Sequence, residues 1–196
     1  MKPTPVPRSI ARVPHEVRII GGLWKRSKLP VPDKPGLRPT PDRVRETLFN
    51  WLGQDLTGWR CVDAFAGTGA LGLEAASRGA ADVLLVEQDP QLVGLLSDAQ
   101  TRFGASAVAV ERGNGLSVLG RLARGSVDLI FLDPPFESDL YDKALAAAAG
   151  ALSPEGMVYL EAPSAWDDAR LGAFGLALVR HLRAGAVHAH LLRRAA

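Results

Sequence analysis

The tetrapeptide Asp133-Pro134-Pro135-Phe136 brings together an acid, two rigid residues and an aromatic ring. An exocyclic amine of a nucleobase is a poor nucleophile because its lone pair is delocalised into the ring. A catalyst must therefore hold its two hydrogens with acceptors, which the Asp133 carboxylate and the Pro134 carbonyl can supply. The prolines stiffen the loop without adding a competing N–H donor, and Phe136 offers a face on which a base can stack. The tetrapeptide thus predicts a site that activates a base amine largely by positioning, with no metal.

A glycine-rich loop earlier in the chain could hold the second reactant. Asp63-Ala-Phe-Ala-Gly67-Thr-Gly69-Ala-Leu-Gly72 follows an apolar, strand-like run and opens a helical one, where glycines let backbone and ligand approach closely. Glu87 ends the next apolar run, where its carboxylate can accept both ribose hydroxyl hydrogens. Gly67-x-Gly69-x-x-Gly72 is also the dinucleotide pattern, but a pyrophosphate has no use for Asp63. S-adenosylmethionine carries cationic groups and no phosphate, so Asp63 favours this methyl donor.

Adenine contacts are expected from the residues that follow the second and third strands, Gln88 and Asn114. Asn114 can accept the adenine amino hydrogen through its side-chain oxygen, although Asn114-Gly115 also fits a plain turn. The predicted cofactor-binding residues are Asp63, Phe65, Ala66, Gly67, Thr68, Gly69, Glu87, Gln88, Asn114 and Asp133. The predicted catalytic residues are Asp133, Pro134, Pro135 and Phe136.

From Gly58 onward, strand-like and helix-like stretches alternate. The expected strands are 60–65, 83–87, 107–111, 127–132 and 157–161, and the expected helices are 70–78, 90–103, 116–123 and 140–152. Near-continuous apolar strands between helices predict a parallel sheet covered on both faces. Residues 176–182 and 187–192 flank a turn and predict a hairpin, so the last strand should run antiparallel. In open sheets of this kind, ligands bind at the carboxyl ends of the strands.

The first 45 residues differ from the rest in charge and composition. They hold 11 Lys and Arg but only three Asp and Glu, a net charge of +8, whereas the remainder carries −6. Residues 1–15 are Pro-rich and predict a mobile tail, 18–29 predict a short hairpin around a Gly-Gly pair, and 30–39 predict an extended loop. Thr40-Pro41-Asp42 predicts a helix start with Thr40 as N-cap. The apolar face of that helix would be formed by Val44, Leu48, Trp51 and Leu52.

The basic N-terminal arm, residues 1–45, precedes an acidic remainder of the chain. This distribution of charge indicates a polyanionic partner, although a solvated tail shows the same bias.

No run reaches the roughly 18 apolar residues of a membrane span, and residues 1–20 lack the apolar region of a secretory signal. Cys61 lies in an apolar run and is expected in the core. His188 and His190 share a strand face, but two histidines without a third ligand do not predict a metal site. We expect a cytoplasmic monomer with a tail (1–15), a basic hairpin and loop (16–39) and one main domain (40–196).

Two further stretches are Arg18-Ile-Ile-Gly-Gly and Gly36-Leu-Arg-Pro-Thr-Pro-Asp-Arg-Val-Arg-Glu-Thr-Leu-Phe-Asn-Trp-Leu52. With the glycine loop and the tetrapeptide, they resemble the RsmD family of bacterial 16S ribosomal RNA guanine-N2 methyltransferases over about residues 17–193. The resemblance implies an α/β, Rossmann-like class I methyltransferase fold: a mostly parallel seven-stranded sheet with an antiparallel last strand, helices on both faces and a small N-terminal basic hairpin. It implies S-adenosyl-L-methionine as the cofactor and a guanine of 16S ribosomal RNA as the target. The sequence departs from the family at Asn114, where an Asp is usual.

The same resemblance implies that the basic arm binds RNA phosphates. The predicted RNA-binding residues are Arg18, Lys25, Arg26, Lys28, Arg38, Arg43 and Arg45. Trp24 could stack on a base or pack under the hairpin. Three other functions fit parts of the sequence: a DNA adenine-N6 methyltransferase, an NAD-dependent oxidoreductase built on Gly67–Gly72, and a non-catalytic RNA-binding or assembly protein. The lack of an added target-recognition domain argues against the first of these three.

Overall fold

The computed structural model describes residues 15–135 and 140–195. Its strands are β1 (Glu16–Arg18), β2 (Lys28–Pro30), β3 (Arg60–Asp63), β4 (Asp82–Glu87), β5 (Val108–Arg112), β6 (Val127–Leu132), β7 (Leu152–Ala162), β8 (Leu176–Ala184) and β9 (Val187–Arg194). Its helices are α1 (Asp42–Trp51), α2 (Gly72–Ser77), α3 (Pro90–Phe103), α4 (Gly115–Arg121), α5 (Tyr141–Ala151) and α6 (Asp168–Gly172).

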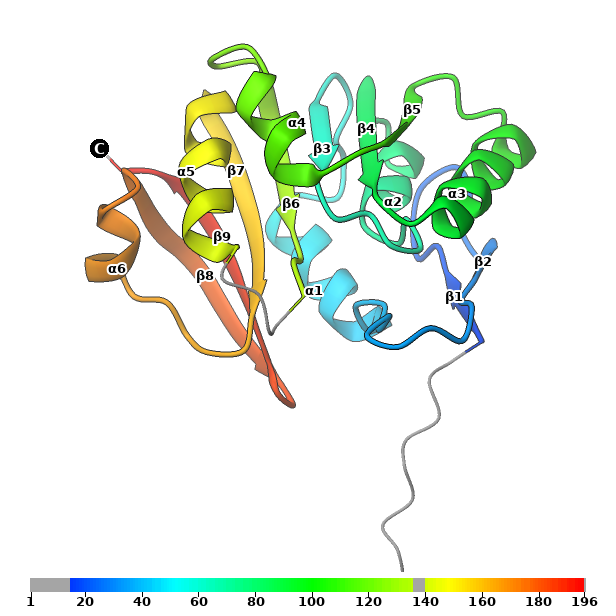
Figure 1. Ribbon diagram of the computed structural model, residues 1–196, viewed down its shortest axis with the longest axis horizontal. Coiled ribbons are helices and arrows are strands. Elements are labelled where there is room, and N and C mark those ends of the chain that lie inside the picture. The colour runs from blue at the N-terminus through cyan, green and yellow to red at the C-terminus, as the bar shows by residue number, and fades with distance from the viewer. Residues whose placement is uncertain (1–14, 136–139, 196) are drawn as a thin grey trace, which may run out of the picture.

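Strands β3 to β9 form one seven-stranded sheet in the order β5-β4-β3-β6-β7-β9-β8. The first five strands in this order pair in parallel, and β9 runs antiparallel to both β7 and β8. The predicted fold is therefore confirmed, including the antiparallel last strand. Figure 1 shows the small hairpin of β1 and β2 at the opposite end of the molecule from β8 and α6.

Most element boundaries match their predictions, and two differences have a physical cause. Strand β7 begins at Leu152, five residues before its predicted start, because Leu152 pairs with Val127 ahead of a bulge in the ladder with β6. Helix α6 was not predicted. It is a single short stretch whose first turn is capped by the Asp167 carboxylate, which accepts the N–H of Arg170 at 2.9 Å.

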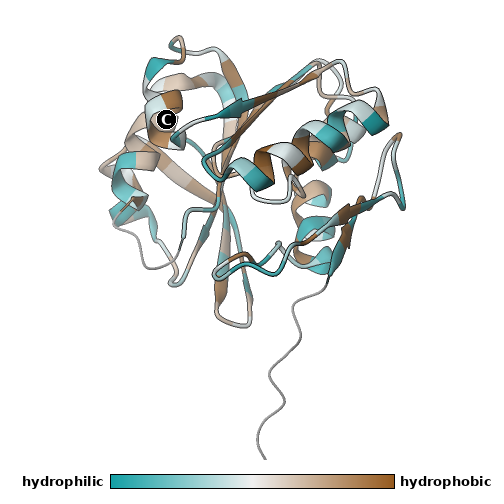
Figure 2. Ribbon diagram, turned by 45° about the vertical axis from the view of Figure 1, so that its right-hand side comes forward, coloured by the Kyte–Doolittle hydropathy of each residue, from teal (hydrophilic) through white to brown (hydrophobic). Residues whose placement is uncertain are grey.

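The strands alternate between two hydrophobic clusters, one on each face of the sheet. In β6, Leu129 and Phe131 lie in the cluster that contains residues of α1, α2 and α3, whereas Ile130 and Leu132 lie in the cluster with α5. Side chains of a strand alternate between faces, so a strand covered on both sides is apolar throughout. Figure 2 shows this difference: the central strands are largely hydrophobic, whereas the helices mix hydrophilic and hydrophobic residues.

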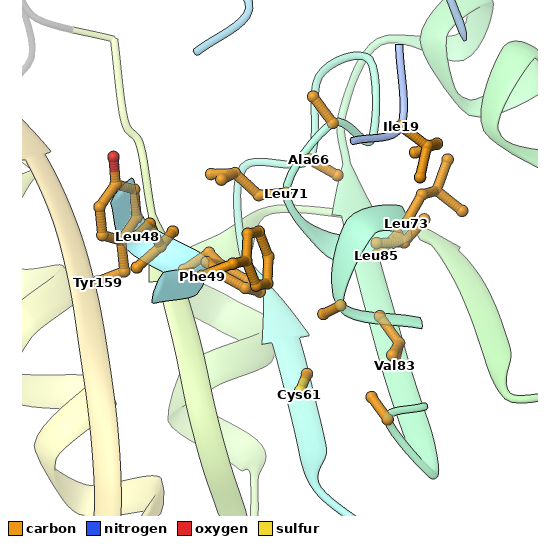
Figure 3. Close-up of a cluster of buried hydrophobic side chains, with 14 of the residues drawn as sticks. Ile19, Leu48, Phe49, Cys61, Ala66, Leu71, Leu73, Val83, Leu85 and Tyr159 are labelled. Atoms are coloured by element: carbon orange, nitrogen blue, oxygen red, sulfur yellow. The ribbon is translucent and has the colours of Figure 1, made fainter. Parts of the chain in front are cut away.

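The N-terminal hairpin packs onto the domain through its own apolar residues. Val17, Ile19, Leu29 and Val31 are buried in the first cluster, and Figure 3 shows Ile19 in that cluster together with Leu48 and Phe49 of α1. The hairpin is therefore predicted correctly and is built into the core. Cys61 is buried as expected, and burial raises the pKa of its thiol to about 12. Among the described residues, no helix has the length and apolar character needed to cross a membrane.

Candidate active site at the carboxyl edge of the sheet

Four carboxylates lie along the carboxyl edge of the sheet, one at each of four neighbouring strands. Glu87 ends β4, Asp63 ends β3, Asp133 directly follows β6, and Glu161 is the penultimate residue of β7. The register aligns Asp63 with Phe131, two residues before Asp133. Because the carboxyl ends of parallel strands meet at one edge, residues spread over a hundred positions of sequence form one acidic row.

The glycine loop is fixed to this row through backbone N–H groups. The N–H of Gly67 donates to Glu87 Oε2 at 2.9 Å, and the N–H of Gly72 donates to Asp63 Oδ2 at 3.0 Å. Gly72 has no room for a side chain, because a Cβ there would lie 2.2 Å from Leu85 Cδ2. The loop therefore reaches the strand ends only because glycine permits this close approach.

Asp63 is a buried acid with an incomplete set of hydrogen bonds. Within the part of the chain that the structure describes, its Oδ1 has no hydrogen-bond partner. Burial raises the pKa of Asp63 to about 7, although the backbone N–H groups of Gly72 and Phe65 work in the opposite direction. A buried carboxylate of this kind favours a cation nearby, so the site fits a cofactor with positively charged groups better than one with a pyrophosphate.

Glu87 is half-buried, and its two oxygens are engaged by backbone. Besides the N–H of Gly67, the carboxylate accepts the N–H groups of Gln88 and Asp89 at 2.8 and 2.9 Å. An ionised carboxylate has about four acceptor positions, so these three bonds fix its direction and leave room for another donor. Contact with ribose hydroxyls stays a prediction for Glu87, as does adenine contact for the exposed Gln88.

Asn114 serves as the N-cap of α4. Its Oδ1 accepts the N–H of Ser117 at 3.1 Å, which is the structural role that an Asn-Gly pair can also fill. The capping bond orients the side-chain amide at the exposed end of β5, and adenine contact stays a prediction for Asn114. Phe65, Ala66, Thr68 and Gly69 all lie in the loop between β3 and α2, as predicted.

The tetrapeptide begins where β6 ends. Asp133 is half-buried, Pro134 is buried and Pro135 is exposed, whereas Phe136 lies outside the described residues. Burial, together with the like charges of Glu161 and Asp63, raises the pKa of Asp133 well above its ordinary value. The ionised form of a carboxyl group with a raised pKa is a stronger base than an ordinary carboxylate, which suits a residue that must accept the hydrogens of an amine.

Asp133 interacts electrostatically with three residues that were not predicted as site residues, Glu161, Tyr159 and Tyr141. Thr40, which was not predicted either, is bonded to Glu161. Glu161 is almost fully buried, and its Oε1 accepts the hydroxyls of Thr40 at 2.6 Å and Tyr159 at 2.9 Å. Burial first, and then Asp133 and Glu161, raise the pKa of Tyr141 to about 12. The only available signal was position: Glu161 was read as the end of a strand, and strand ends form the ligand edge.

Thr40 is also a correction to the predicted helix start. The N-cap of α1 is Pro41, whose carbonyl accepts the N–H groups of Val44 and Arg45. The Thr40 hydroxyl is directed to Glu161 instead of to the helix. The hydroxyl donates a charge-assisted hydrogen bond to the buried carboxylate, and this bond turns its oxygen away from the helix N–H groups that an N-cap would accept, so the tertiary contact overrides the local capping pattern.

The Pro-rich loop that follows β2 lies against the cofactor edge. Lys34 forms an ion pair with Asp89, the N-cap of α3, and a Cβ placed on Gly67 would meet Leu37 Cδ1 at 3.4 Å. With Thr40 bonded to Glu161, this loop contacts the ends of β4, β3 and β7. The sequence predicted an extended loop here but did not indicate that it forms part of the site.

Most of the predicted RNA-binding cations are exposed, and one is not. Arg45 is wholly buried: it donates to Asp42, Glu74 and the carbonyl of Arg18. Its predicted role as a phosphate contact is therefore wrong, because a side chain at the centre of a buried ion cluster cannot reach RNA. The exposed members of the predicted set are Arg18, Lys25, Arg26, Lys28, Arg38 and Arg43.

The aromatic and histidine predictions are resolved by packing. Trp24 stacks on Phe103 of α3 with ring centroids 4.9 Å apart, which favours the packing role. His190 is not a surface residue: it is fully buried, its Nε2 accepts the N–H of Trp166 at 3.0 Å, and burial lowers its pKa to about 4. His188 is half-buried beside His181. No cluster of three or more potential metal ligands occurs among the described residues.

Comparisons with known proteins agree with this architecture. The chain is 45% identical to Ribosomal RNA small subunit methyltransferase D of Escherichia coli (strain K12) over 148 residues, 74% of each chain. It is 41% identical to the Haemophilus influenzae protein of the same name, over 74% of this chain and 78% of that one. The solved structure of yhhF from Escherichia coli, named as a methyltransferase, aligns with a TM-score of 0.82 and 40% identity, covering 92% of this chain and 99% of that one. Residues 17–193 match the family described as Conserved hypothetical protein 95, and the chain therefore belongs to this family, the RsmD family of methyltransferases.

Proposed function

We propose that this protein transfers a methyl group from S-adenosylmethionine to the exocyclic N2 amine of a guanine in 16S ribosomal RNA. The observation that carries the proposal is the position of Asp133 and Pro134 at the end of β6, next to β3 with its glycine loop. The names of the curated relatives support ribosomal RNA of the small subunit as the substrate.

The cofactor would lie over the glycine loop, between the ends of β4 and β6. Glu87 would hold the ribose, Gln88 and Asn114 would contact the adenine, and Asp63 with Asp133 would face the cationic methionine end. The unpartnered Oδ1 of Asp63 supports this assignment. When bound, S-adenosylmethionine supplies a sulfonium methyl group that is open to in-line attack.

The chain's own contribution is to position and polarise the amine. The Asp133 carboxylate and the Pro134 carbonyl accept the two amine hydrogens, which directs the nitrogen lone pair out of the base plane. Asp133 then accepts the proton that the methylated nitrogen loses, and its raised pKa favours this transfer. Phe136 is proposed as the stacking surface for the base.

The exposed cations of the N-terminal segment would hold the RNA backbone. Residues 16–39 form the basic hairpin and loop on the main domain 40–196, and their charge favours a polyanion. We expect the protein to act as a monomer in the cytoplasm, on 16S ribosomal RNA or on an assembling small subunit.

The direct test measures tritium transfer from labelled S-adenosylmethionine to small-subunit RNA and to the small-subunit particle, followed by mass spectrometry of the nucleosides. The expected product is N2-methylguanosine. Asp133→Asn should lower the rate by about 10²–10⁴-fold while RNA affinity changes little. No transfer to either substrate would overturn the proposal.

Three other outcomes would each identify a different function. Preference for DNA with N6-methyladenine as product would identify a DNA adenine methyltransferase. Calorimetric binding of NAD but not S-adenosylmethionine would identify a dehydrogenase. If Asp133→Asn leaves RNA-dependent phenotypes intact in cells, the protein acts by binding RNA and not by catalysis.

A further inference from the structure

A polar pocket of about 430 Å³ lies away from the acidic row, between the hairpin loop and the outer face of α1. Its lining includes the backbone of Gly21 and Gly22 and the side chains of Lys25, Asn50, Gln54 and Arg78. None of these side chains has a part in the methyl-transfer chemistry proposed above. The pocket therefore needs an explanation of its own.

One wall of the pocket is held rigidly against α2. Both oxygens of Glu74 accept backbone N–H groups of the hairpin loop, from Ile20 and Gly21, at 2.7 Å each. Ser77 Oγ donates to the carbonyl of Gly21 at 2.7 Å and accepts the N–H of Trp24 at 2.9 Å. Gly22 has a φ of +73°, and a Cβ there would lie 1.8 Å from the Ser77 carbonyl oxygen. Only glycine allows this contact, so the wall is fixed when the hairpin docks.

The amides in the pocket are oriented before any ligand arrives. Gln54 donates through Nε2 to Asn50 Oδ1 at 2.6 Å, and its own Oε1 accepts from Arg78 at 3.0 Å. Gln54 has a φ of +68° and Arg26, next to Lys25, has a φ of +72°; among the described residues these are the non-glycine residues with positive φ. Backbone strain of this kind concentrates at functional sites, and here both instances flank the same pocket.

The charges around the pocket favour an anion. Three guanidinium groups, those of Arg18, Arg45 and Arg78, are paired with only two carboxylates, Asp42 and Glu74. This cluster therefore keeps one excess positive charge, and at the pocket the charge of the exposed Lys25 is balanced by that of Glu46, so the net excess is one positive charge. Glu46 also lines the pocket and supplies an acceptor that a base amine or imine hydrogen can use, although it opposes a phosphate at its own position.

We infer that this pocket binds a second nucleotide of the RNA substrate, with its phosphate near the exposed Lys25 and its base edge at Asn50 and Gln54. The inference rests on the proposed function. Arg43 shares a helix face with Glu46 and Asn50, at spacings of three and seven residues, so a continuous outer face leads from the start of α1 to the pocket. Ten residues of helix span about 15 Å, so the bound nucleotide lies a few positions from the target guanine. The pocket then contributes to substrate specificity, because an RNA must fit the pocket for its target guanine to be placed at Asp133.

The test compares Asn50→Asp and Lys25→Gln with Lys143→Gln, a control at an exposed lysine of α5 on the other face of the sheet. Loss of one charge-assisted contact corresponds to about a tenfold change in affinity. Asn50→Asp and Lys25→Gln should therefore each raise KM for small-subunit RNA about tenfold, with kcat changed less than twofold. Lys143→Gln should change neither constant. Equal KM values in Asn50→Asp and Lys143→Gln, in an enzyme that still methylates RNA, would overturn the pocket inference alone, because a rise in Lys25→Gln by itself also follows from a phosphate contact outside the pocket.

A second measurement does not depend on kinetics. Benzoylphenylalanine placed at position 50 should crosslink under ultraviolet light to one nucleotide close in the RNA to the methylated guanine, and the same group at position 143 should not. A crosslink spread evenly along the RNA, or formed only with protein, would exclude the pocket as a nucleotide site. If wild-type enzyme transfers no methyl group to RNA, the proposed function fails first, and this result is recognised before any variant is compared.

Discussion

The hydroxyl of Thr40 donates a 2.6 Å hydrogen bond to Oε1 of Glu161, joining residues 121 positions apart. The same carboxylate oxygen accepts the hydroxyl of Tyr159, and Arg45 Nε donates to the Thr40 carbonyl at 3.2 Å. The segment that leads from the basic hairpin into α1 is therefore fixed to the acidic row beside Asp133. If the proposed function is right, one rigid unit presents both the RNA bound by the arm and the base bound by Asp133.

Thr40→Val should remove the hydrogen bond that fixes the segment before α1 to Glu161. A hydrogen bond to a charged group contributes about 2 kcal/mol, so the free energy of unfolding should fall by about that amount. Loss of alignment at Asp133 should lower kcat/KM for RNA about tenfold. Denaturant unfolding and methyl-transfer assays measure the two effects.

The matched control for this change is Thr47→Val. The Thr47 hydroxyl donates only to the carbonyl of Arg43 within α1, so its loss should change stability by less than about 0.5 kcal/mol and leave methyl transfer unaltered. If Thr40→Val weakens stability but not methyl transfer, the bond to Glu161 has a structural role alone.

Arg45→Met and Arg43→Met should separate a buried cation from an exposed one on the same helix. Arg45→Met leaves the buried Glu74 without one of its cations and should cost about 3–5 kcal/mol of unfolding free energy. Arg43→Met should leave stability within about 0.5 kcal/mol and lower the slope of log affinity for RNA against log salt by about 0.7–0.9. An unchanged slope would remove Arg43 from the phosphate contacts.

The residues at strand ends could be predicted because their positions follow from periodicity. Asp63, Glu87 and Asp133 each close an apolar run, and parallel strands bring such ends together whatever their separation in sequence. Glu161 closes a run as well, but no motif distinguishes it from any other acid at a strand end. Its role becomes visible only through Thr40 and Tyr159, which are bonded to it.

Arg45 and Thr40 were misread for the same physical reason. Helix periodicity ranks positions by hydrophobicity, so an arginine is assigned to solvent, and capping rules consider only the first turn. Arg45 is buried because Asp42 and Glu74 compensate its charge, and Thr40 turns from the helix because a buried carboxylate is nearby. The burial of Arg45 depends on Glu74 of α2 and the orientation of the Thr40 hydroxyl depends on Glu161 of β7, and a local sequence pattern contains no information about either partner.

The buried Asp63 should make both stability and cofactor affinity depend on pH. Its folded pKa of about 7 exceeds the ordinary value of 3.8, so the protonated form is the one favoured by folding. The stability that it contributes is present below about pH 4 and is lost as pH rises through 7. Affinity for a cationic cofactor should change in the opposite sense and increase through pH 7, because the ionised carboxylate attracts it.

Asp63→Asn tests this relationship, with unfolding and calorimetric titrations of S-adenosylmethionine carried out from pH 5.5 to 8.5. The variant should abolish the decline in stability across that range and flatten the pH dependence of affinity. Asp128→Asn is the control, because Arg60 holds the pKa of Asp128 at about 2, and its effect on stability should be independent of pH in this range. A wild-type affinity that does not change with pH would contradict the assignment of Asp63 to the cofactor.

Trp24 and Leu23 are adjacent in the hairpin loop but should respond in opposite ways to truncation. Trp24 stacks on Phe103, so Trp24→Ala should cost about 2 kcal/mol of unfolding free energy through lost packing. Leu23 is 83% exposed, and Leu23→Ala should change stability by less than about 0.5 kcal/mol. Thermal and denaturant unfolding of the two variants give the comparison. Since the Trp24 N–H also fixes the loop to Ser77, RNA affinity should fall in Trp24→Ala together with stability; a loss of affinity at unchanged stability would instead show that the indole contacts a base.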